Sequence, residues 1–569
     1  MLGGLFGNRR TTEAAQCNGI IISGDNNQNI AIHYGPTEGH LTIPFKPNSL
    51  TDSIDSLLIW QSQLTPLIGR DKTLAELEQW AKTGPRISLK LIHGEGGVGK
   101  TRLAFELATL LKKQDWEAGQ LATLSGGSGF RLGQLGTLLV IDYPEQQPKR
   151  VQQLLQGIKE VEEPAAPLRI LLLSRHPQLL EQLGEPLHYL TAPALSLCSL
   201  DEESAAWQLF KAAWPRLCQQ RRQADRPLPI DQTAFSRWLT QHERHNQPLF
   251  ILAYLINLFD EPQATTLSAA QIIERLVARE EDRLAREGEA AGLQPVALPL
   301  LKGLAAITGG ITAQQLKTLA GHDSLAARLP DYEVLRHRSI WRVEDGEGSV
   351  VELQPDLLAA ALLSRLLKRD DDLPGEWLYA ALDVSGDMKK ATSRLGRLMH
   401  DAIQILDLPW PQQALNGAVA DDLSRCCRLD EGLNRDYLER PLLPLALHVT
   451  QRVAEAAEEP SEQARLFNNL SVRLAESGDR AGGLKAIQRA VEIDDKLAAE
   501  NFAAYAPDLA GSLAILAIRL EERGEMSEAI TTVERAIVLI TPFAIDGTTY
   551  ADWLAVMKNN LARYQTVLE

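Results

Sequence analysis

The residues Gly94-Glu95-Gly96-Gly97-Val98-Gly99-Lys100-Thr101 fit the phosphate-binding loop pattern G-x-x-x-x-G-K-[ST] at every fixed position. A β-prone segment at residues 87–92 leads into this loop, and residues 102–108 behind it have the apolar spacing of an amphipathic helix. In such a setting backbone N–H groups face the phosphates, the lysine reaches the β- and γ-phosphates, and the hydroxyl can bind Mg²⁺. A glycine-rich turn that binds nothing is the alternative. We predict a site for ATP/ADP and Mg²⁺, with contacts from Gly94, Gly96, Gly97, Val98, Gly99, Lys100, Thr101 and Arg102.

Length and composition bound the kind of protein. A chain of 569 residues is too long for one core and predicts about three to five domains. The formal net charge of -16 argues against an extended nucleic-acid surface, which needs clustered Lys and Arg. Five cysteines without zinc-site spacing fit a reducing cytosol, and no run of about 18 apolar residues is present. We expect a cytoplasmic protein without a secretory signal or a membrane span.

Two apolar runs predict buried strands that end in charged residues. Residues 137–141 precede Asp142, whose carboxylate at the carboxyl end of a strand can serve Mg²⁺ directly or through water. Glu145 follows and could orient an attacking water. Residues 168–174 precede Arg175. The alternatives are a turn or capping acid at Asp142 and a solvent-facing side chain at Arg175.

Further strands are expected at residues 116–124 and 187–190, with helices between them. Alternating strands and helices predict a parallel sheet covered on both faces, a three-layer α/β domain.

The segment Leu67-Ile68-Gly69-Arg70-Asp71, upstream of the loop, resembles the hhGRE motif of STAND-type NTPases, the class that includes NACHT and NB-ARC proteins. The resemblance implies that Ile68, Gly69 and Arg70 line the adenine side. Pro248 resembles the proline that abuts the adenine from the helical subdomain of these proteins, although Asn246 stands where the family has glycine.

Two more residues gain a role from this resemblance. Arg175 matches the sensor 1 position, which points a basic group toward the γ-phosphate. Family members carry an acid directly after the Walker B aspartate, whereas this chain carries Tyr143, which implies slow hydrolysis or another catalytic group.

The resemblance and the helical patterns together predict a multidomain protein. An α/β P-loop NTPase domain is followed by an all-α helical lid, a winged helix and an α-solenoid of tetratricopeptide-like repeats. The repeats are predicted because residues 470–478 recur in pattern at residues 516–524, with a generic helical bundle as the alternative. The expected domains are residues 1–50, 51–198, 199–295, 296–370 and 371–569.

The N-terminal segment differs from the rest of the chain. Residues 18–32 place two β-branched runs around a Ser-Gly-Asp-Asn-Asn turn, with one acidic residue and no Lys, Arg or Pro. This composition permits stacking into fibrils, and it resembles the RIP homotypic interaction motif and related amyloid signalling motifs. A β-hairpin or a disordered tail is the alternative.

These expectations combine into one hypothesis, a signalling switch controlled by ATP and ADP. The repeats would sense a protein ligand, nucleotide exchange would release the lid, and homo-oligomers would template a separate effector that carries a matching motif, in immune-like (antiphage) defence. A steadily turning ATPase chaperone or motor is one rival. A DNA-binding regulator that uses Arg336, His337 and Arg338 is the other, although nucleic-acid binding is not expected.

Overall fold

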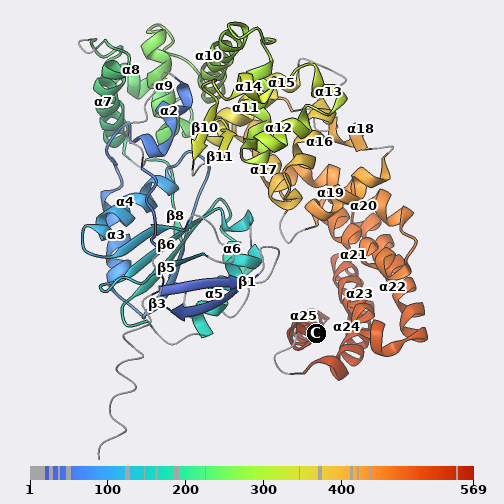
Figure 1. Cartoon of the computed structure of the whole chain (residues 1–569). Helices are drawn as coiled ribbons and strands as arrows, with labels where there is room; N and C mark the ends of the chain where they lie inside the picture. Colours follow the sequence, from blue (N-terminus) through green and yellow to red (C-terminus); the bar gives the residue numbers. More distant parts are fainter. Residues whose placement is uncertain are drawn as a thin grey trace, which may run out of the picture.

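We describe a computed structural model of the chain. It describes residues 19–24, 30–35, 37, 39–45, 53–121, 128–146, 148–160, 164–182, 191–200, 202–223, 226–344, 347–368, 374–410, 414–419, 422–434, 438–545 and 549–568. In Figure 1 the chain forms an arch: an α/β domain lies at the lower left, helical domains lie across the top, and a series of helix pairs descends on the right.

The α/β domain is built on a five-stranded parallel sheet with the strand order β4-β6-β7-β3-β8. The strands are β3 (Ile87–His93), β4 (Glu117–Gln120), β6 (Thr137–Asp142), β7 (Leu168–Ser174) and β8 (Leu195–Ser196). Because β7 pairs with both β3 and β6, its carboxyl end lies between the phosphate loop and Asp142. The predicted parallel sheet is confirmed. Residues 187–190, expected as a strand, lie outside the described residues.

Helices cover both faces of this sheet, as the period-two side-chain alternation of strands requires. Helices α3 (Asp71–Lys82) and α4 (Lys100–Lys112) share a core with Leu138, Val140 and Leu171. Helix α5 (Pro148–Glu160) packs on the opposite face against alternate residues of the same strands. The three-layer arrangement predicted from the sequence is therefore present.

The N-terminal segment forms a hairpin that is part of this domain. Strands β1 (Gly19–Gly24) and β2 (Ile30–Gly35) pair antiparallel, and β1 also pairs antiparallel with β5 (Ser128–Arg131). The side chains of Ile20 and Ile22 have no exposed surface, and they share a core with residues of α5. In this structure the segment adopts the hairpin that the sequence left open as an alternative. Residues 25–29, the centre of the proposed amyloid motif, lie outside the described residues.

An all-helical domain follows the sheet. Its elements are α7 (Glu203–Gln220), α8 (Gln232–Leu239), η4 (Glu243–Asn246), α9 (Pro248–Asp260) and α10 (Ala269–Glu289). The short helix α2 (Ile54–Leu58), which precedes the sheet in sequence, contributes three residues to the core of this domain. The helical domain and the α/β domain are thus joined by two chain segments.

The next part combines helices with a small sheet. Helix α11 (Ala297–Thr308) leads into an antiparallel sheet of order β10-β11-β9, formed by Trp341–Glu344, Glu347–Val350 and Ile311–Thr312. Three short helices lie between β9 and β10: α12 (Ala313–Leu319), α13 (Asp323–Ala326) and α14 (Tyr332–Leu335). Helix α15 (Asp356–Leu367) leaves this sheet and packs on α10 and α11.

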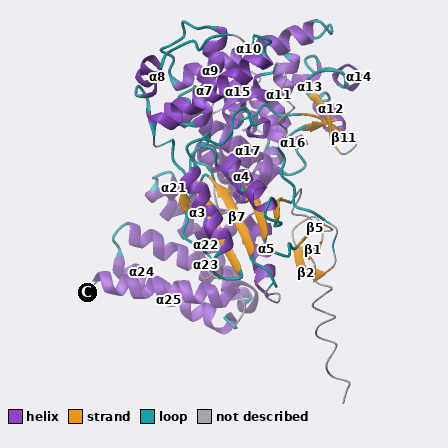
Figure 2. Ribbon diagram, turned by 90° about the vertical axis from the view of Figure 1, so that its left-hand side faces the viewer, coloured by secondary structure: helices purple, strands orange, loops and turns teal. Residues whose placement is uncertain are grey.

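Most of the remaining described residues are helical, as Figure 2 shows. They form α16 (Pro374–Val384), α17 (Met388–His400), the π-helical turn η5 (Asp401–Ile405), α18 (Ala414–Val419), α19 (Leu423–Leu433), η6 (Arg440–Leu442), α20 (Leu443–Ala456), α21 (Pro460–Glu476), α22 (Arg480–Glu500), α23 (Phe502–Glu522), α24 (Met526–Ile540), η7 (Thr541–Phe543) and α25 (Thr549–Leu568).

Helices α21 to α25 pack in sequence order, each against the next. The turns after α21 and α23 both contain a glycine with positive φ, Gly478 at 94° and Gly524 at 80°. This equivalence fits the internal similarity seen in the sequence. By length and composition α23 could cross a membrane, but half of its apolar window is buried against neighbouring helices, as in a core helix.

Candidate nucleotide site

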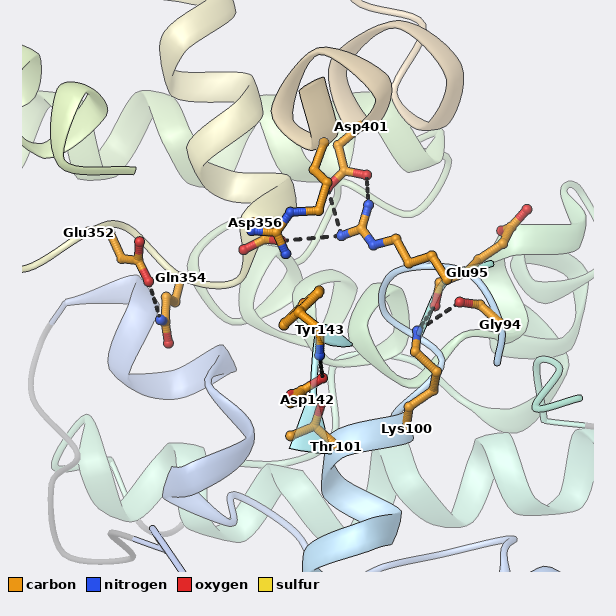
Figure 3. A network of polar contacts seen from close by, with 12 residues as sticks. Gly94, Glu95, Lys100, Thr101, Asp142, Tyr143, Glu352, Gln354, Asp356 and Asp401 are labelled. Carbon is orange, nitrogen blue, oxygen red and sulfur yellow. Dashed lines mark hydrogen bonds and ion pairs between the residues drawn. The ribbon is translucent and has the colours of Figure 1, made fainter. Parts of the chain in front are cut away.

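The phosphate loop connects β3 to the first turn of α4 (Figure 3). Gly97 and Gly99 have φ values of 89° and 95°, which residues with a side chain rarely adopt, so the loop geometry requires glycine at both positions. The Lys100 amine donates to the carbonyl oxygens of Gly94 at 2.7 Å and Glu95 at 2.9 Å. The lysine is thereby held across the mouth of the loop, where an incoming phosphate would meet it.

The predicted magnesium residues lie side by side. The Thr101 hydroxyl donates to one carboxylate oxygen of Asp142 at 2.9 Å, and the Tyr143 N–H donates to the other at 3.1 Å. A hydroxyl and a carboxylate in contact at the foot of a phosphate loop are oxygen donors of the kind that Mg²⁺ uses together with phosphate oxygens. Among the described residues no group of three or more His, Cys, Asp or Glu could hold a metal, so Mg²⁺ here would depend on the phosphates for further ligands.

A cavity of ≈ 210 Å³ extends from the loop between the α/β domain and the helical domain. Residues 96–101 form its phosphate end. Apolar residues line much of the rest of the cavity, among them Ile68, Pro248, Leu249 and Leu252. A polar loop next to an apolar wall suits a phosphorylated ligand with a flat, apolar base. The sequence placed Ile68 and Pro248 beside the base, and both lie in this cavity.

Gly69 and Arg70 support the site. The Arg70 guanidinium donates to the carbonyl oxygens of Val98 at 3.3 Å and Cys198 at 2.5 Å, and so ties the phosphate loop to the segment after β8. Gly69 has φ of 71°, and a Cβ there would lie 2.7 Å from that of Ala205. Arg70 also lines the cavity.

Arg102 is likewise committed to neighbouring groups. Its guanidinium pairs with Glu106 at 2.5 Å and donates to the Thr65 carbonyl at 3.0 Å. These contacts fasten α4 to the segment that carries Ile68. Arg102 lines the cavity, where its backbone N–H in the first turn of α4 can still face a phosphate.

Burial shapes the ionisation of the predicted catalytic residues. It lowers the pKa of Lys100 to about 8, with a further lowering from Arg175, while Asp142 and Glu145 oppose the shift. Burial also raises the pKa of Asp142, against the hydrogen bond from Thr101. The same cause raises the pKa of Glu145, a buried residue in the 3₁₀ turn η2 (Pro144–Gln146). A raised pKa makes this carboxylate a stronger base toward water, although Glu145 is not among the residues that line the nucleotide cavity.

Arg175 occupies the predicted place at the end of β7, but its partners come from the C-terminal half of the chain. It forms a two-point ion pair with Asp401, with one contact at 3.1 Å, and it lies 3.3 Å from Asp356. Asp401 has no exposed surface. Burial alone would lower the pKa of Arg175. The interactions with Asp401, Tyr143 and Asp356 outweigh burial and raise this pKa well above its usual value. Arg175 therefore carries a fixed positive charge that is neutralised within the protein.

Arg397 on α17 is a second arginine at the site, which the sequence analysis did not identify. Its guanidinium lies over the Tyr143 ring, 4.2 Å from the centroid, and 3.5 Å from the Asp356 carboxylate. Asp356 begins α15 and lines the nucleotide cavity. Burial acts to raise the pKa of Asp356, but the positive charges of Arg397 and Arg175 lower it below its usual value. Figure 3 shows Asp356 and Asp401 above Tyr143.

The proposed DNA-facing cluster is engaged locally. Arg336 pairs with Glu333 at 2.9 Å, and its Nε lies 3.1 Å from a ring nitrogen of His337. The Arg338 side chain donates to the Val334 carbonyl at 3.3 Å.

The strand order, the glycine loop, and the contact between Thr101 and Asp142 define the α/β part as a P-loop NTPase domain. Two solved structures resemble the chain. A Signal Transduction ATPase with Numerous Domains (STAND) protein with a tetratricopeptide repeat sensor, from Pyrococcus horikoshii, aligns over 88% of this chain and 84% of its own, with 11% identity and a TM-score of 0.21. The ORC1 protein of Aeropyrum pernix, in complex with DNA, aligns over 55% of this chain and 98% of its own, with 15% identity and a TM-score of 0.27.

TM-scores of this size do not establish a shared architecture, so the assignment of the domain rests on its own geometry. No protein-family model and no curated protein matches the chain.

Proposed function

We propose that this protein is a signalling switch whose conformation is set by ATP or ADP. The observation that carries the proposal is the buried ion pair between Arg175, at the phosphate end of the site, and Asp401, in the C-terminal half. Arg175 also faces Gly96 of the phosphate loop, since a Cβ at Gly96 would lie 3.2 Å from its Nη2. One side chain thus touches both the nucleotide loop and the part of the chain that would move.

The physical basis is competition for Arg175. A γ-phosphate carries more negative charge than one carboxylate and offers several oxygens to a guanidinium. ATP would draw Arg175 away from Asp401, whereas ADP would leave the pair intact. A ligand shifts a conformational equilibrium only by its difference in affinity for the two states, and this exchange of partners supplies such a difference. In this proposal the conformation with the pair formed is the ADP-type state.

Hydrolysis would return the switch to that state. The bound nucleotide would supply the bond that is cleaved, and Mg²⁺ would neutralise charge on the phosphates. Thr101 and Asp142 would hold the metal, Lys100 would contact the β- and γ-phosphates, and Glu145 would take a proton from the attacking water. Arg397 covers Tyr143, which stands beside Asp142 where the resemblance expects an acid, so we propose slow hydrolysis.

The remaining parts would serve sensing and output, in an immune-like defence role as the family resemblance implies. The order of α11, three short helices and the sheet of β9 to β11 supports a winged helix that closes on the nucleotide through Asp356. The stacked pairs α21 to α25 support a repeat surface for a protein ligand. Activated chains would oligomerise. Templating of an effector by the N-terminal strands would first require their release from β5, because β1 is paired on both edges.

The test is the nucleotide content and size of the purified protein. We expect ADP to copurify with a monomer, and ATP with Mg²⁺ to produce larger assemblies with turnover below about 1 s⁻¹. Steady turnover above that rate, without any change in size, would show a motor or chaperone instead.

A further inference from the structure

A second cavity, of ≈ 630 Å³, adjoins the phosphate loop and has no role in nucleotide binding as described above. Three parts of the structure line it: residues 94–96 with the end of β7, the junction of α17 and η5, and η6 with the start of α20. A closed conformation is therefore needed to form it, because its walls belong to both halves of the molecule.

This cavity and the nucleotide cavity share two lining residues, Gly96 and Arg175. The Arg175 guanidinium, held against Asp401 above Gly96, forms the partition between them. A group that left the γ-phosphate position past Arg175 would enter the second cavity.

Basic side chains dominate the polar lining. They are Arg175, His176, Arg397, His400 and Arg440. Two acids also line the cavity. Each has a partner outside this group, as Arg175 has in Asp401 and Arg397 has in Asp356. Glu95 accepts a hydrogen bond from Gln247 at 2.9 Å and lies 3.6 Å from Arg244, and Glu439 accepts one from Ser393 at 3.2 Å.

The two histidines of this lining are held in the neutral form. Burial, followed by the charges of Arg175, His400, Lys100 and Arg397, lowers the pKa of His176 to about 4. Burial also lowers the pKa of His400, where Arg175 acts in the same direction and Asp401 opposes it. Because burial is the main cause, these shifts keep both imidazoles neutral, and a neutral imidazole can donate one N–H to an anion.

We propose that this cavity binds inorganic phosphate, held by Arg440 and His400 on the C-terminal side, while Arg175 keeps its ion pair with Asp401 on the loop side. The inference rests on the proposed nucleotide site but adds a second ligand to it. Phosphate bound there bridges the two halves of the chain and stabilises the closed form together with ADP. It comes either from hydrolysis of ATP at the adjoining loop or from solution.

The first experiment titrates inorganic phosphate into the full-length ADP-loaded protein by calorimetry. We expect binding that Arg440→Gln weakens about tenfold, as for the loss of one charge-assisted contact. Arg452→Gln, at an exposed position of α20 away from the cavity, is the matched control and should bind phosphate like the parent. No binding up to about 10 mM phosphate, or equal binding by parent and Arg440→Gln, overturns the proposal.

A second experiment separates the two sources of phosphate. The protein is mixed with γ-labelled ATP for a single turnover and passed rapidly over a desalting column. Label retained by the parent and lost from Arg440→Gln shows capture of the product, whereas titration binding without retained label shows uptake from solution. ADP content is measured in the same samples: loss of ADP contradicts the proposed switch, while retained ADP without any phosphate binding contradicts this inference alone.

Discussion

Arg175 at the carboxyl end of β7 and Asp401 in the π-helical turn after α17 form a buried ion pair across 226 residues of sequence. Asp356 and Arg397, which also belong to the C-terminal half, lie beside this pair. Isolated π-helical turns in proteins are often functional, and here the turn begins at the residue that holds Arg175. The pair therefore gives the site a physical link to the rest of the chain.

Replacing Lys100 with Ala should abolish nucleotide retention. The lysine amine, now bound to the Gly94 and Glu95 carbonyl oxygens, is the charge placed to meet the β- and γ-phosphates. We expect the purified variant to contain no ADP by chromatography of the denatured protein while keeping the parent's circular dichroism spectrum. ADP retained at the parent's level would show that the nucleotide binds elsewhere.

Tyr143→Ala should loosen the closed form, whereas Tyr143→Phe should not. Arg397 lies over this ring, and a buried cation–π contact contributes up to about 2 kcal/mol. We expect ADP to dissociate from the alanine variant roughly tenfold faster, as measured with a fluorescent ADP analogue. Equal dissociation rates from the two variants would exclude the ring face as the contact that matters.

Ile22→Ala should destabilise the α/β domain, because Ile22 is fully buried in the core that the hairpin shares with α5. The expected loss is about 3 kcal/mol in the free energy of unfolding. Ile21→Ala is the matched control, since Ile21 is on the opposite face of β1 and only partly buried, and it should cost about 1 kcal/mol or less. A detached N-terminal segment would make both variants as stable as the parent in chemical unfolding.

Asp494→Asn should stabilise the helical repeats at neutral pH. Burial, with Asp508 and Asp495 nearby, raises the pKa of Asp494 to about 6, against the hydrogen bond from Ser512 at 2.6 Å. An acid whose pKa is raised on folding costs stability as pH increases from its unfolded value near 4 through 6, and the cost is constant above that. We expect the variant to gain about 2 kcal/mol at pH 7.5 and nothing at pH 4. Parallel melting-temperature profiles from pH 4 to 8 would disprove this.

The sequence was sufficient for the parts of the site that are local. Strand, glycine loop and helix are contiguous, so their order predicts the positions of Lys100 and Thr101, and the apolar run before Asp142 predicts a parallel strand that brings it to the same edge. The pairing of β7 with both neighbours, which places Arg175 beside the loop, could be expected only from the family resemblance.

Arg397 and Asp401 could not be found in the same way. An arginine and an aspartate near the end of an amphipathic helix are ordinary surface residues by pattern, and only the tertiary fold brings them more than 200 residues back to β7. The N-terminal strands show the reverse problem. Their composition fits both a fibril and a hairpin, and the choice depends on β5 and α5, whose positions no local pattern reveals.

The central claim is that Asp401 competes with the γ-phosphate for Arg175, and the ratio of ADP to ATP affinity in Asp401→Asn tests it most directly. The substitution removes the competing charge but keeps the size of the side chain. Asp495→Asn, which breaks an exposed pair with Arg535, is the control and should leave the ratio unchanged. The account predicts that Asp401→Asn shifts the ratio toward ATP by about tenfold or more. An unchanged ratio in Asp401→Asn, measured by calorimetry with Mg²⁺, would contradict it.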